Sequence, residues 1–157
     1  MIHIIYLGYQ KKKGYEPKFI PLAGKINTMM PSWVVKKMLN KIKNYKQKIL
    51  ILGVAYKKNV DDDRESPSFE IMKILKKRKI SFEYNDPYFD KIRKGRQNKI
   101  IKKSISLNKT NLKKFSAVIL VTDHDQYNYK YIAQNSKIIF DTRGVYKKFN
   151  FNNVFYC

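Results

Sequence analysis

Three short apolar runs, each ending in a cluster of polar residues, constrain the fold of this chain more than any other feature. The runs are KILILGVAY (48–56), SAVILVTDH (116–124) and KIIFDTRG (137–144). Apolar runs of this length are typical of strands that are buried on both faces of a parallel sheet. Because helices must cover both faces of such a sheet, the runs predict an α/β fold.

The stretch that follows the first run predicts a strand–helix–strand unit. Ser66-Pro67 supplies a helix cap and then a proline at the first helical position, where a missing N–H is harmless. Ile80, Phe82 and Tyr84 then alternate with other residues as in a strand, and Asn85-Asp86-Pro87 is a turn signal. Two parallel strands joined by a helix are expected to form a right-handed unit.

Two shorter helices and an irregular segment complete the expected order of elements. TNLKKF (110–115) predicts a short helix with Thr110 as its cap, and YKYIAQN (129–135) predicts another. Residues 89–104 have no regular pattern and are expected to form a variable surface excursion.

A long amphipathic helix is expected ahead of the sheet, in LAGKINTMMPSWVVKKMLNKIKNY (22–45). Pro31 fits a first helical turn, and Trp33, Val34, Met38 and Ile42 follow at spacings of one helical face. The spacing leaves open whether this face packs on the chain's own sheet or forms a linker or dimer contact. The expected architecture is a small Rossmann-like open parallel sheet flanked by helices and preceded by this long helix.

The composition fits one folded domain. The 157 residues are 43% hydrophobic, which is enough for one core but not for two comfortable ones. The net charge of +22 would favour nucleic acid or a membrane surface as partner. The lysines are spread along the chain, however, and Lys, Asn, Ile and Tyr are abundant together, as an AT-rich coding sequence would produce. Nucleic-acid binding is therefore a lesser alternative, and its affinity would fall steeply with added salt.

Cysteine, histidine and membrane signals exclude several other classes. Cys157 is the single cysteine and is poorly placed for catalysis. His124 lies between two aspartates, but the other histidine, His3, lies far away in sequence and no metal-like spacing supports His124, so no metal site is expected. No apolar run approaches the roughly 20 residues that span a bilayer, and the apolar-then-basic start reverses the order of a signal peptide. We expect a cytoplasmic protein without membrane contact.

The polar ends of the three runs indicate where a ligand binds. In open α/β sheets, ligands bind beyond the carboxyl ends of the strands. Lys57, Arg64, Arg143 and the amides of the helix start after Ser66 would suit a diphosphate or another anion.

The acidic residues of the same region also have plain structural roles. Asp61–Asp63 can neutralise nearby lysines, and Asp141 can pair with Arg64 or Arg143. Asp123 and Asp125 can serve as turn or cap residues. Gly53 is not followed by the glycines of a dinucleotide-binding turn, and neither a P-loop nor a supported Ser-His-Asp arrangement is present. The residues alone therefore predict an anion-binding α/β domain, for a nucleotide, without a definable reaction.

The motif G-V-A-Y-K-(x6)-R-E-S-P at 53–67 resembles a signature of the UDP-glucose/GDP-mannose dehydrogenase family, in its branch that oxidises UDP-N-acetyl-hexosamines. Four further segments are similar to that family in the same order: FIPLAGKINTMMPSWVV (19–35), YNDPYF (84–89), VTDHDQYNYKYI (121–132) and FDTRG (140–144). Together these segments cover nearly the whole chain.

The resemblance implies a division of the chain and a set of site residues. It assigns residues 1–46 to the family's central helical segment, which dimerises through the helix at 31–44, and 47–157 to its C-terminal UDP-binding domain. It implies that Tyr56, Lys57 and Arg143 contact the UDP-sugar. It also implies that Arg64 reaches the side of the cleft that faces NAD.

The resemblance also implies that part of the active site lies outside this sequence. Family members oxidise the C6 alcohol of the sugar in two NAD-dependent steps through a cysteine thiohemiacetal, in the synthesis of polysaccharide precursors. The NAD-binding domain and that cysteine would precede Met1, and His3 takes the place of a family aspartate. Thiohemiacetal chemistry requires a thiolate within reach of the aldehyde, so no residue of this chain is expected to be catalytic.

Three functional expectations follow. The first is the C-terminal fragment of an NAD-dependent UDP-N-acetylhexosamine 6-dehydrogenase, inactive unless a separately encoded N-terminal half supplies the NAD domain. The second is a stand-alone module that binds a UDP-sugar or nucleotide without turnover. The third is the nucleic-acid-binding domain discussed above. Sequence alone does not identify the sugar.

Overall fold

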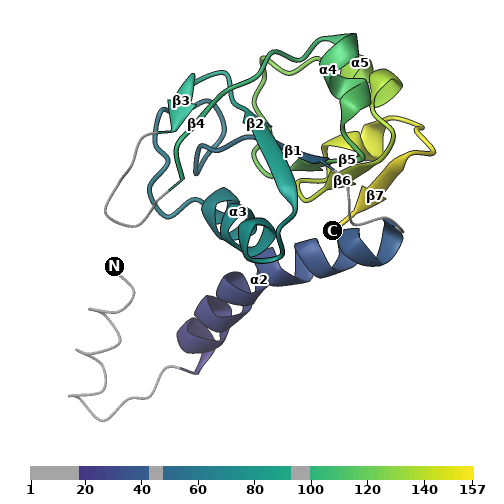
Figure 1. Ribbon diagram of the computed structural model, residues 1–157. Coiled ribbons are helices and arrows are strands. Elements are labelled where there is room, and N and C mark those ends of the chain that lie inside the picture. Colours follow the sequence, from purple (N-terminus) through teal and green to yellow (C-terminus); the bar gives the residue numbers. More distant parts are fainter. Residues whose placement is uncertain (1–17, 43–47, 93–99) are drawn as a thin grey trace.

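A parallel five-stranded sheet forms the centre of the molecule in the computed structural model, which describes residues 18–42, 48–92 and 100–157 (Figure 1). The expected α/β architecture is confirmed. The strands, in sheet order, are β2 (Ser81–Asn85), β1 (Lys48–Leu52), β5 (Ala117–Leu120), β6 (Ile139–Asp141) and β7 (Val154–Tyr156).

The remaining elements surround this sheet. The helices are α2 (Phe19–Lys41), α3 (Pro67–Lys77), α4 (Lys109–Lys114) and α5 (Tyr129–Asn135), with a short 3-10 helix, η1 (Val145–Lys148). The segment 89–104, which was expected to have no regular structure, contains a small antiparallel pair, β3 (Lys91–Ile92) with β4 (Lys102–Lys103).

The order of the strands reverses between β1 and β5. From β1 the chain crosses through α3 to β2, and it later returns to β5 on the other side of β1. The loops that leave the carboxyl ends of β1 and β5 therefore diverge in opposite directions. Ligands bind at such switch points in open α/β sheets, so this edge is the first place to look for a site.

The apolar runs are continuous because each strand is covered on both faces. Ile49 and Ile51 belong to the core on the side of α2 and α3, whereas Leu50 and Leu52 belong to the core on the side of α4 and α5. All four side chains are buried. Figure 1 shows the two pairs of helices on opposite sides of the sheet.

Helix α2 begins twelve residues earlier than its proline suggested. The prediction that Pro31 occupies the first turn was wrong, because the helix starts at Phe19 and contains Pro31 in its interior. Proline removes the donor that would bond to the carbonyl of Asn27, but Asn27 is exposed and water can satisfy it. Figure 1 shows the helix bending near its middle, as expected at an internal proline.

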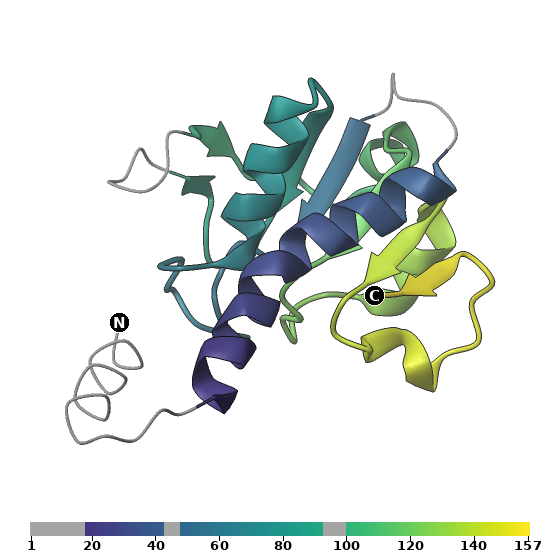
Figure 2. The same cartoon turned by 90° about the horizontal axis from the view of Figure 1, so that it is seen from below.

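The two halves of α2 have different surroundings. After the bend, Val34, Val35 and Met38 are buried against the sheet and α3, and Lys37 Nζ donates to the carbonyl of Tyr156 (2.6 Å). Figure 2 shows this part crossing the sheet between α3 and β7. In the earlier half, most of the large apolar side chains are exposed. Of the apolar residues spaced after Pro31, Val34, Met38 and Ile42 thus pack on the chain's own sheet, whereas Trp33 is exposed.

The caps of the shorter helices were only partly predictable. Ser66 caps α3 as expected, with its Oγ accepting from the Ser68 amide (3.3 Å). Thr110 does not cap α4; Asn108 does, through its Oδ1 and the Asn111 amide (2.8 Å). Strand β7 was not predicted at all.

Two sequence-based expectations fall outside the described residues. One is the division between 46 and 47, and the other is the position of His3. Among the helices of the described ranges, none combines the length and apolar character that crossing a membrane requires.

Candidate functional site

A groove of about 910 Å³ lies between α2 and the carboxyl edge of the sheet. Tyr56, Lys57 and Arg143, the three residues expected to bind substrate, all line it. Its volume lies in the range of small-molecule sites. The rest of the wall consists of Asn27, Thr28, Met30, Pro31, Val34, Glu65, Pro67, Glu70, Ile71, Val121, Thr142 and Cys157.

The loop after β1 brings Tyr56 and Lys57 to the groove. The Tyr56 amide donates to the carbonyl of Asp62 (2.7 Å), which folds the loop back on itself. The Tyr56 side chain is 49% exposed, so its ring is available to a ligand. Within the described residues, the Lys57 ammonium takes part in no hydrogen bond or ion pair, and it is therefore a free cation on the groove wall.

The turn after β6 places Arg143 opposite that loop. Asp141 does not pair with the guanidinium of Arg64 or Arg143, as was considered from the sequence. Instead its buried carboxylate accepts from the amides of Arg143 (2.8 Å), Gly144 (2.8 Å) and Tyr146 (2.9 Å). Arg143 Nε donates to Asp123 Oδ1 (2.9 Å), which orients the side chain across the sheet edge.

Arg64 stands apart from the other three predicted site residues. Its guanidinium makes two parallel hydrogen bonds to Asp62, from Nε to Oδ1 (2.8 Å) and from a terminal nitrogen to Oδ2 (2.9 Å). These bonds lower the pKa of Asp62 to about 2. The Arg64 side chain is 85% exposed and does not line the groove, so the structure fixes its direction without bringing it to Lys57 and Arg143.

Two carboxylates also border the groove. The carboxylate of Glu70 forms an ion pair with Lys73 (2.6 Å). The backbone of Glu65 has a φ of 60°, which non-glycine residues rarely adopt. The charged groups of the wall thus come from the loop after β1, from α3 and from the turn after β6, whereas α2 contributes Met30, Pro31 and Val34 as apolar residues.

A buried pair, Asp86 and His124, was not predicted as part of the site. His124 has no exposed surface, and its Nε2 lies 3.1 Å from Asp86 Oδ2. Its Nδ1 accepts from the Asn59 amide (3.0 Å). Since Nδ1 accepts, the proton is on Nε2, and the imidazole is neutral and donates to Asp86.

Asp86 gathers hydrogen bonds from the loop after β1 as well. Its Oδ2 accepts from the amides of Val54 (2.6 Å) and Ala55 (2.9 Å), and its Oδ1 accepts from the Tyr88 amide (2.8 Å). Burial by itself would raise the pKa of Asp86. The hydrogen bonds from His124 and the three amides outweigh burial, so the pKa lies below the ordinary value of a carboxyl.

These bonds also decide what the turn after β1 can hold. In a dinucleotide-binding fold, the amides of this turn and of the following helix receive the pyrophosphate. Here the carboxylate of Asp86 occupies the amides of Val54 and Ala55. The turn therefore does not fit a dinucleotide.

The expected free amides at the start of α3 are absent among the described residues. Pro67 has no N–H, the Ser68 amide donates to Ser66 Oγ, and the Phe69 amide donates to the Ser66 carbonyl (3.2 Å). The expectation that this helix start binds an anion was therefore wrong.

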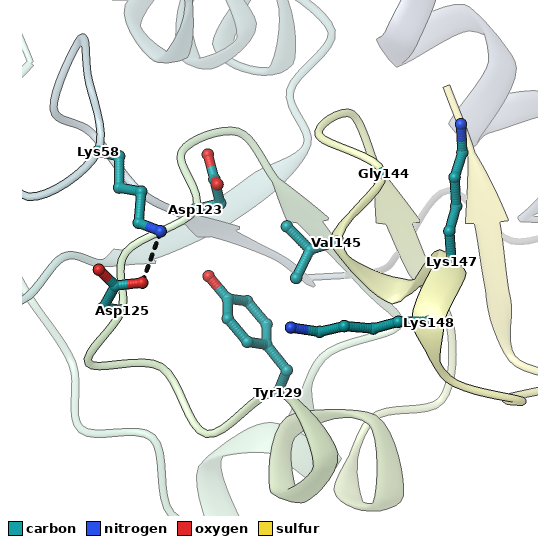
Figure 3. Close-up of a pocket in the computed structure, with 8 residues that line it drawn as sticks. All are labelled: Lys58, Asp123, Asp125, Tyr129, Gly144, Val145, Lys147 and Lys148. Atoms are coloured by element: carbon teal, nitrogen blue, oxygen red, sulfur yellow. Dashed lines mark ion pairs between the residues drawn. The ribbon is translucent and has the colours of Figure 1, made fainter.

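A second, smaller pocket of about 310 Å³ lies on the other side of the turn after β6. Figure 3 shows Lys58 paired with Asp125 in it, Tyr129 and Lys148 near its centre, and Lys147 pointing away. Lys58 Nζ is 2.6 Å from Asp125, and Asp123 also lines the pocket. Asp123 and Asp125 oppose the positive charge of the lysines there, and none of the predicted substrate-binding residues lines this pocket, so the larger groove is the better candidate.

Metal ligands do not gather in this region. Within 18–42, 48–92 and 100–157, no group of three or more His, Cys, Asp or Glu side chains could hold a metal ion.

Comparison with known proteins gives relatives along most of the chain. Residues 50–148 match the UDP-binding domain of the UDP-glucose/GDP-mannose dehydrogenase family. A UDP-N-acetyl-D-mannosamine dehydrogenase of Methanococcus maripaludis is 31% identical over 147 residues, which cover 85% of this chain and 32% of the relative. One from Methanocaldococcus jannaschii is 31% identical over 142 residues, with 85% and 31% covered. The chain thus spans about a third of the length of the curated relatives it matches.

Solved structures lead to the same group. The UDP-N-acetyl-mannosamine dehydrogenase Cap5O from S. aureus is 29% identical with a TM-score of 0.67, over 88% of this chain and 32% of that one. A UDP-glucose dehydrogenase from Pyrobaculum islandicum, 20% identical, shares the fold with a TM-score of 0.72, over 98% and 35%. The parallel sheet, the signature at 53–67 and these matches agree, and the chain belongs to the UDP-glucose/GDP-mannose dehydrogenase family, of which it carries the UDP-binding domain.

Proposed function

We propose that this chain binds a UDP-sugar in the groove between α2 and the carboxyl edge of the sheet. The observation that carries the proposal is the convergence of Tyr56, Lys57 and Arg143 on one groove from two separate loops. Lys57 and Arg143 would neutralise the diphosphate, and the half-exposed ring of Tyr56 would pack on an apolar face of the ligand. The relatives named as UDP-N-acetyl-D-mannosamine dehydrogenases support a UDP-N-acetylhexosamine.

In the whole enzyme, this chain would form the UDP-sugar side of an NAD-dependent 6-dehydrogenase. The NAD domain and the cysteine nucleophile would come from a region or a chain other than the described residues, for example a separately encoded N-terminal half. Asp62 holds Arg64 outward from the loop, and this exposure supports Arg64 as the residue that faces the cofactor. The described residues by themselves would bind without turnover.

Thermal unfolding in the presence of UDP tests the binding proposal. A ligand at one hundred times its Kd stabilises the folded chain by about 2.7 kcal/mol, so the Tm should rise by several degrees. Lys57→Ala and Arg143→Ala should each reduce that rise. Lys114→Ala is the matched control, because Lys114 is exposed on α4, far from the groove in the fold, and it should leave the rise intact.

Two results would refute this assignment. The first is an unchanged Tm for the wild-type chain at millimolar UDP and UDP-N-acetylglucosamine. The second is an equal rise in the wild-type, Lys57→Ala and Arg143→Ala chains, which would place any nucleotide site elsewhere.

We also propose that two copies of the chain associate through the first half of α2. Phe19, Leu22, Ile26, Met29 and Trp33 are exposed and recur at alternating spacings of three and four residues. This spacing is that of a coiled-coil seam, which buries a narrow apolar stripe against a partner helix. The proposed contact therefore begins earlier than the helix at 31–44 expected from the sequence, and it shares only Trp33 with that range.

Light scattering coupled to size exclusion tests this association. Ile26→Glu places a charge in the middle of the stripe and should convert a dimer into a monomer. Gly24→Glu adds the same side chain away from the stripe, where nothing lies within 4 Å of an added Cβ, and it should leave the dimer intact. A monomeric wild-type chain at high micromolar concentration would argue against the proposal.

A further inference from the structure

Asp86 and His124 line neither pocket, yet together they hold both ends of the short segment that carries Tyr56 and Lys57. Asp86 Oδ2 accepts from the amides of Val54 and Ala55, immediately before Tyr56. His124 Nδ1 accepts from the Asn59 amide, two residues after Lys57. The bond between His124 Nε2 and Asp86 Oδ2 (3.1 Å) joins the two anchor points.

The hydrogen-bonding atoms of Asp86 and His124 are already engaged, so a lost bond would not be replaced by another. Asp86 Oδ2 accepts from three donors, and both nitrogens of His124 are engaged. Neither side chain is open to water, since Asp86 is 3% exposed and His124 is fully buried. A buried donor or acceptor that loses its partner costs the folded state its full desolvation free energy. Conformations of the segment that break these bonds are therefore disfavoured, and the segment is fixed in one conformation.

The far end of the segment is strained and held a second time. Asn59 has φ of 58°, which non-glycine residues rarely adopt. Its side chain exchanges two hydrogen bonds with Asp125, from Nδ2 to Oδ2 (2.6 Å) and from the Asp125 amide to Oδ1 (3.0 Å). The His124 bond and this clamp therefore hold the chain at Asn59, two residues after Lys57, which lines the groove.

We propose that Asp86 and His124 are positioning residues for UDP-sugar binding. They would not touch the ligand; they would hold Tyr56 and Lys57 in the conformation that the ligand requires, so that little ordering is needed on binding. This inference rests on the function proposed above. It predicts that breaking either bond of His124 weakens ligand binding in a chain that remains folded.

Three near-isosteric substitutions separate the contacts. Asp86→Asn keeps the size of the side chain, but the amide cannot accept from all three donors. His124→Asn keeps a polar atom near Nδ1 for the Asn59 amide and loses the contact with Asp86. His124→Gln keeps a polar atom near Nε2 for the contact with Asp86 and loses the bond to the Asn59 amide. It therefore releases the end of the segment next to Lys57.

The readout is the Kd of UDP by calorimetry together with amide hydrogen exchange at residues 54, 55 and 59. Asp86→Asn and His124→Gln should weaken UDP binding about tenfold, the factor that one charged hydrogen bond corresponds to. Both should also speed exchange at the amides that they release. His124→Asn should retain slow exchange at Asn59 and bind more tightly than His124→Gln.

Tyr84→Phe is the matched control for a buried hydrogen bond lost elsewhere. The Tyr84 hydroxyl donates to the Phe89 carbonyl (3.1 Å) beside the edge strand β2, and neither residue lines a pocket, so the variant should lose stability without changing the Kd of UDP. A purely structural role for Asp86 and His124 would instead make all four variants alike in Kd, and that result would overturn the inference.

The same experiment separates failure of the inference from failure of the proposed function. If the wild-type chain does not bind UDP, the proposed function fails. The inference then fails as well if amide exchange at Asn59 is equally slow in His124→Gln and the wild type. If the wild type binds and Asp86→Asn or His124→Gln binds equally well, only the inference is overturned.

A nitrogen spectrum of the wild-type imidazole should show the neutral form protonated at Nε2; protonation at Nδ1 would contradict the geometry.

Discussion

Replacing Gly53 by alanine should destabilise the fold strongly, because Gly53 lies where β1 and β5 approach each other at the switch point. Gly53 has φ of 85°, and an added Cβ would lie 2.5 Å from Thr122 Cβ and 2.5 Å from the Thr122 carbonyl oxygen. The backbone of Thr122 is fixed by hydrogen bonds to the carbonyl of Leu52 from its own amide (3.2 Å) and from that of Val121 (2.8 Å). The clash therefore cannot be relieved by rotating a side chain.

The magnitude follows from three contributions. A left-handed backbone costs a non-glycine residue about 1–2 kcal/mol, and forcing an extra methyl into a packed site costs about 1–3 kcal/mol. Alanine restricts the unfolded chain, which returns about 0.4–1 kcal/mol. The free energy of unfolding should thus fall by about 2–4 kcal/mol, a large share of the 5–15 kcal/mol typical of a domain.

Two other glycines serve as controls in the same denaturant titration. Gly144 also has positive φ (72°), but its added Cβ would meet only the flexible side chain of Lys147 at 3.4 Å, so Gly144→Ala should cost about 1 kcal/mol or less. Gly24 lies in α2 with nothing within 4 Å, so Gly24→Ala should be neutral or stabilising. If Gly53→Ala costs no more than Gly144→Ala at equal denaturant slope, the reasoning about the close approach is refuted.

Further predictions concern the cap of α3, the cap of α4 and acid stability. Ser66→Ala and Asn108→Ala should each lower the free energy of unfolding by about 1 kcal/mol, measured by denaturant titration; no change would contradict the capping bonds. The pKa of Asp86 is depressed in the folded state, so its stabilisation is present above the unfolded pKa of about 4 and is lost as pH falls through the lower folded value. The difference in unfolding free energy between wild type and Asp86→Asn should therefore shrink below about pH 4. A difference that grows as the pH falls would contradict a depressed pKa of Asp86.

The elements that could be predicted from sequence are those whose local pattern and final environment agree. The run at 48–52 is apolar throughout and is covered on both faces, and the predicted helix at 129–135 matches α5 residue for residue. Ser66-Pro67 carries the cap and the helix start in two adjacent residues. In these places, local chemistry is enough to define the element.

The elements that were missed depend on distant contacts. Strand β7 has only three residues and exists because it pairs with β6, so its own sequence carries little signal. Pro31 reads locally as a helix start, but it is tolerated inside α2, where the residue that loses its hydrogen-bond donor, Asn27, is exposed to water. Thr110 and Asn108 are both plausible caps in sequence, and only the backbone geometry selects Asn108.

The candidate site was predictable in part for the same reason. Tyr56, Lys57 and Arg143 follow the ends of parallel strands, so the topology brings them together. The Asp86–His124 pair joins residues 38 positions apart, and each reads locally as part of a polar turn. Its burial, which gives the pair its strength, is not visible in the sequence.

Titration of the isotopically labelled chain with UDP, followed by amide chemical shifts, tests the central claim most directly. We expect saturable shifts at Lys57, Thr142 and Arg143, which line the groove, and weaker binding in Lys57→Ala. The amides of Tyr129 and Lys148, which line the smaller pocket, should remain unchanged (Figure 3). Shifts confined to the smaller pocket, or no shifts at millimolar UDP, would contradict the account.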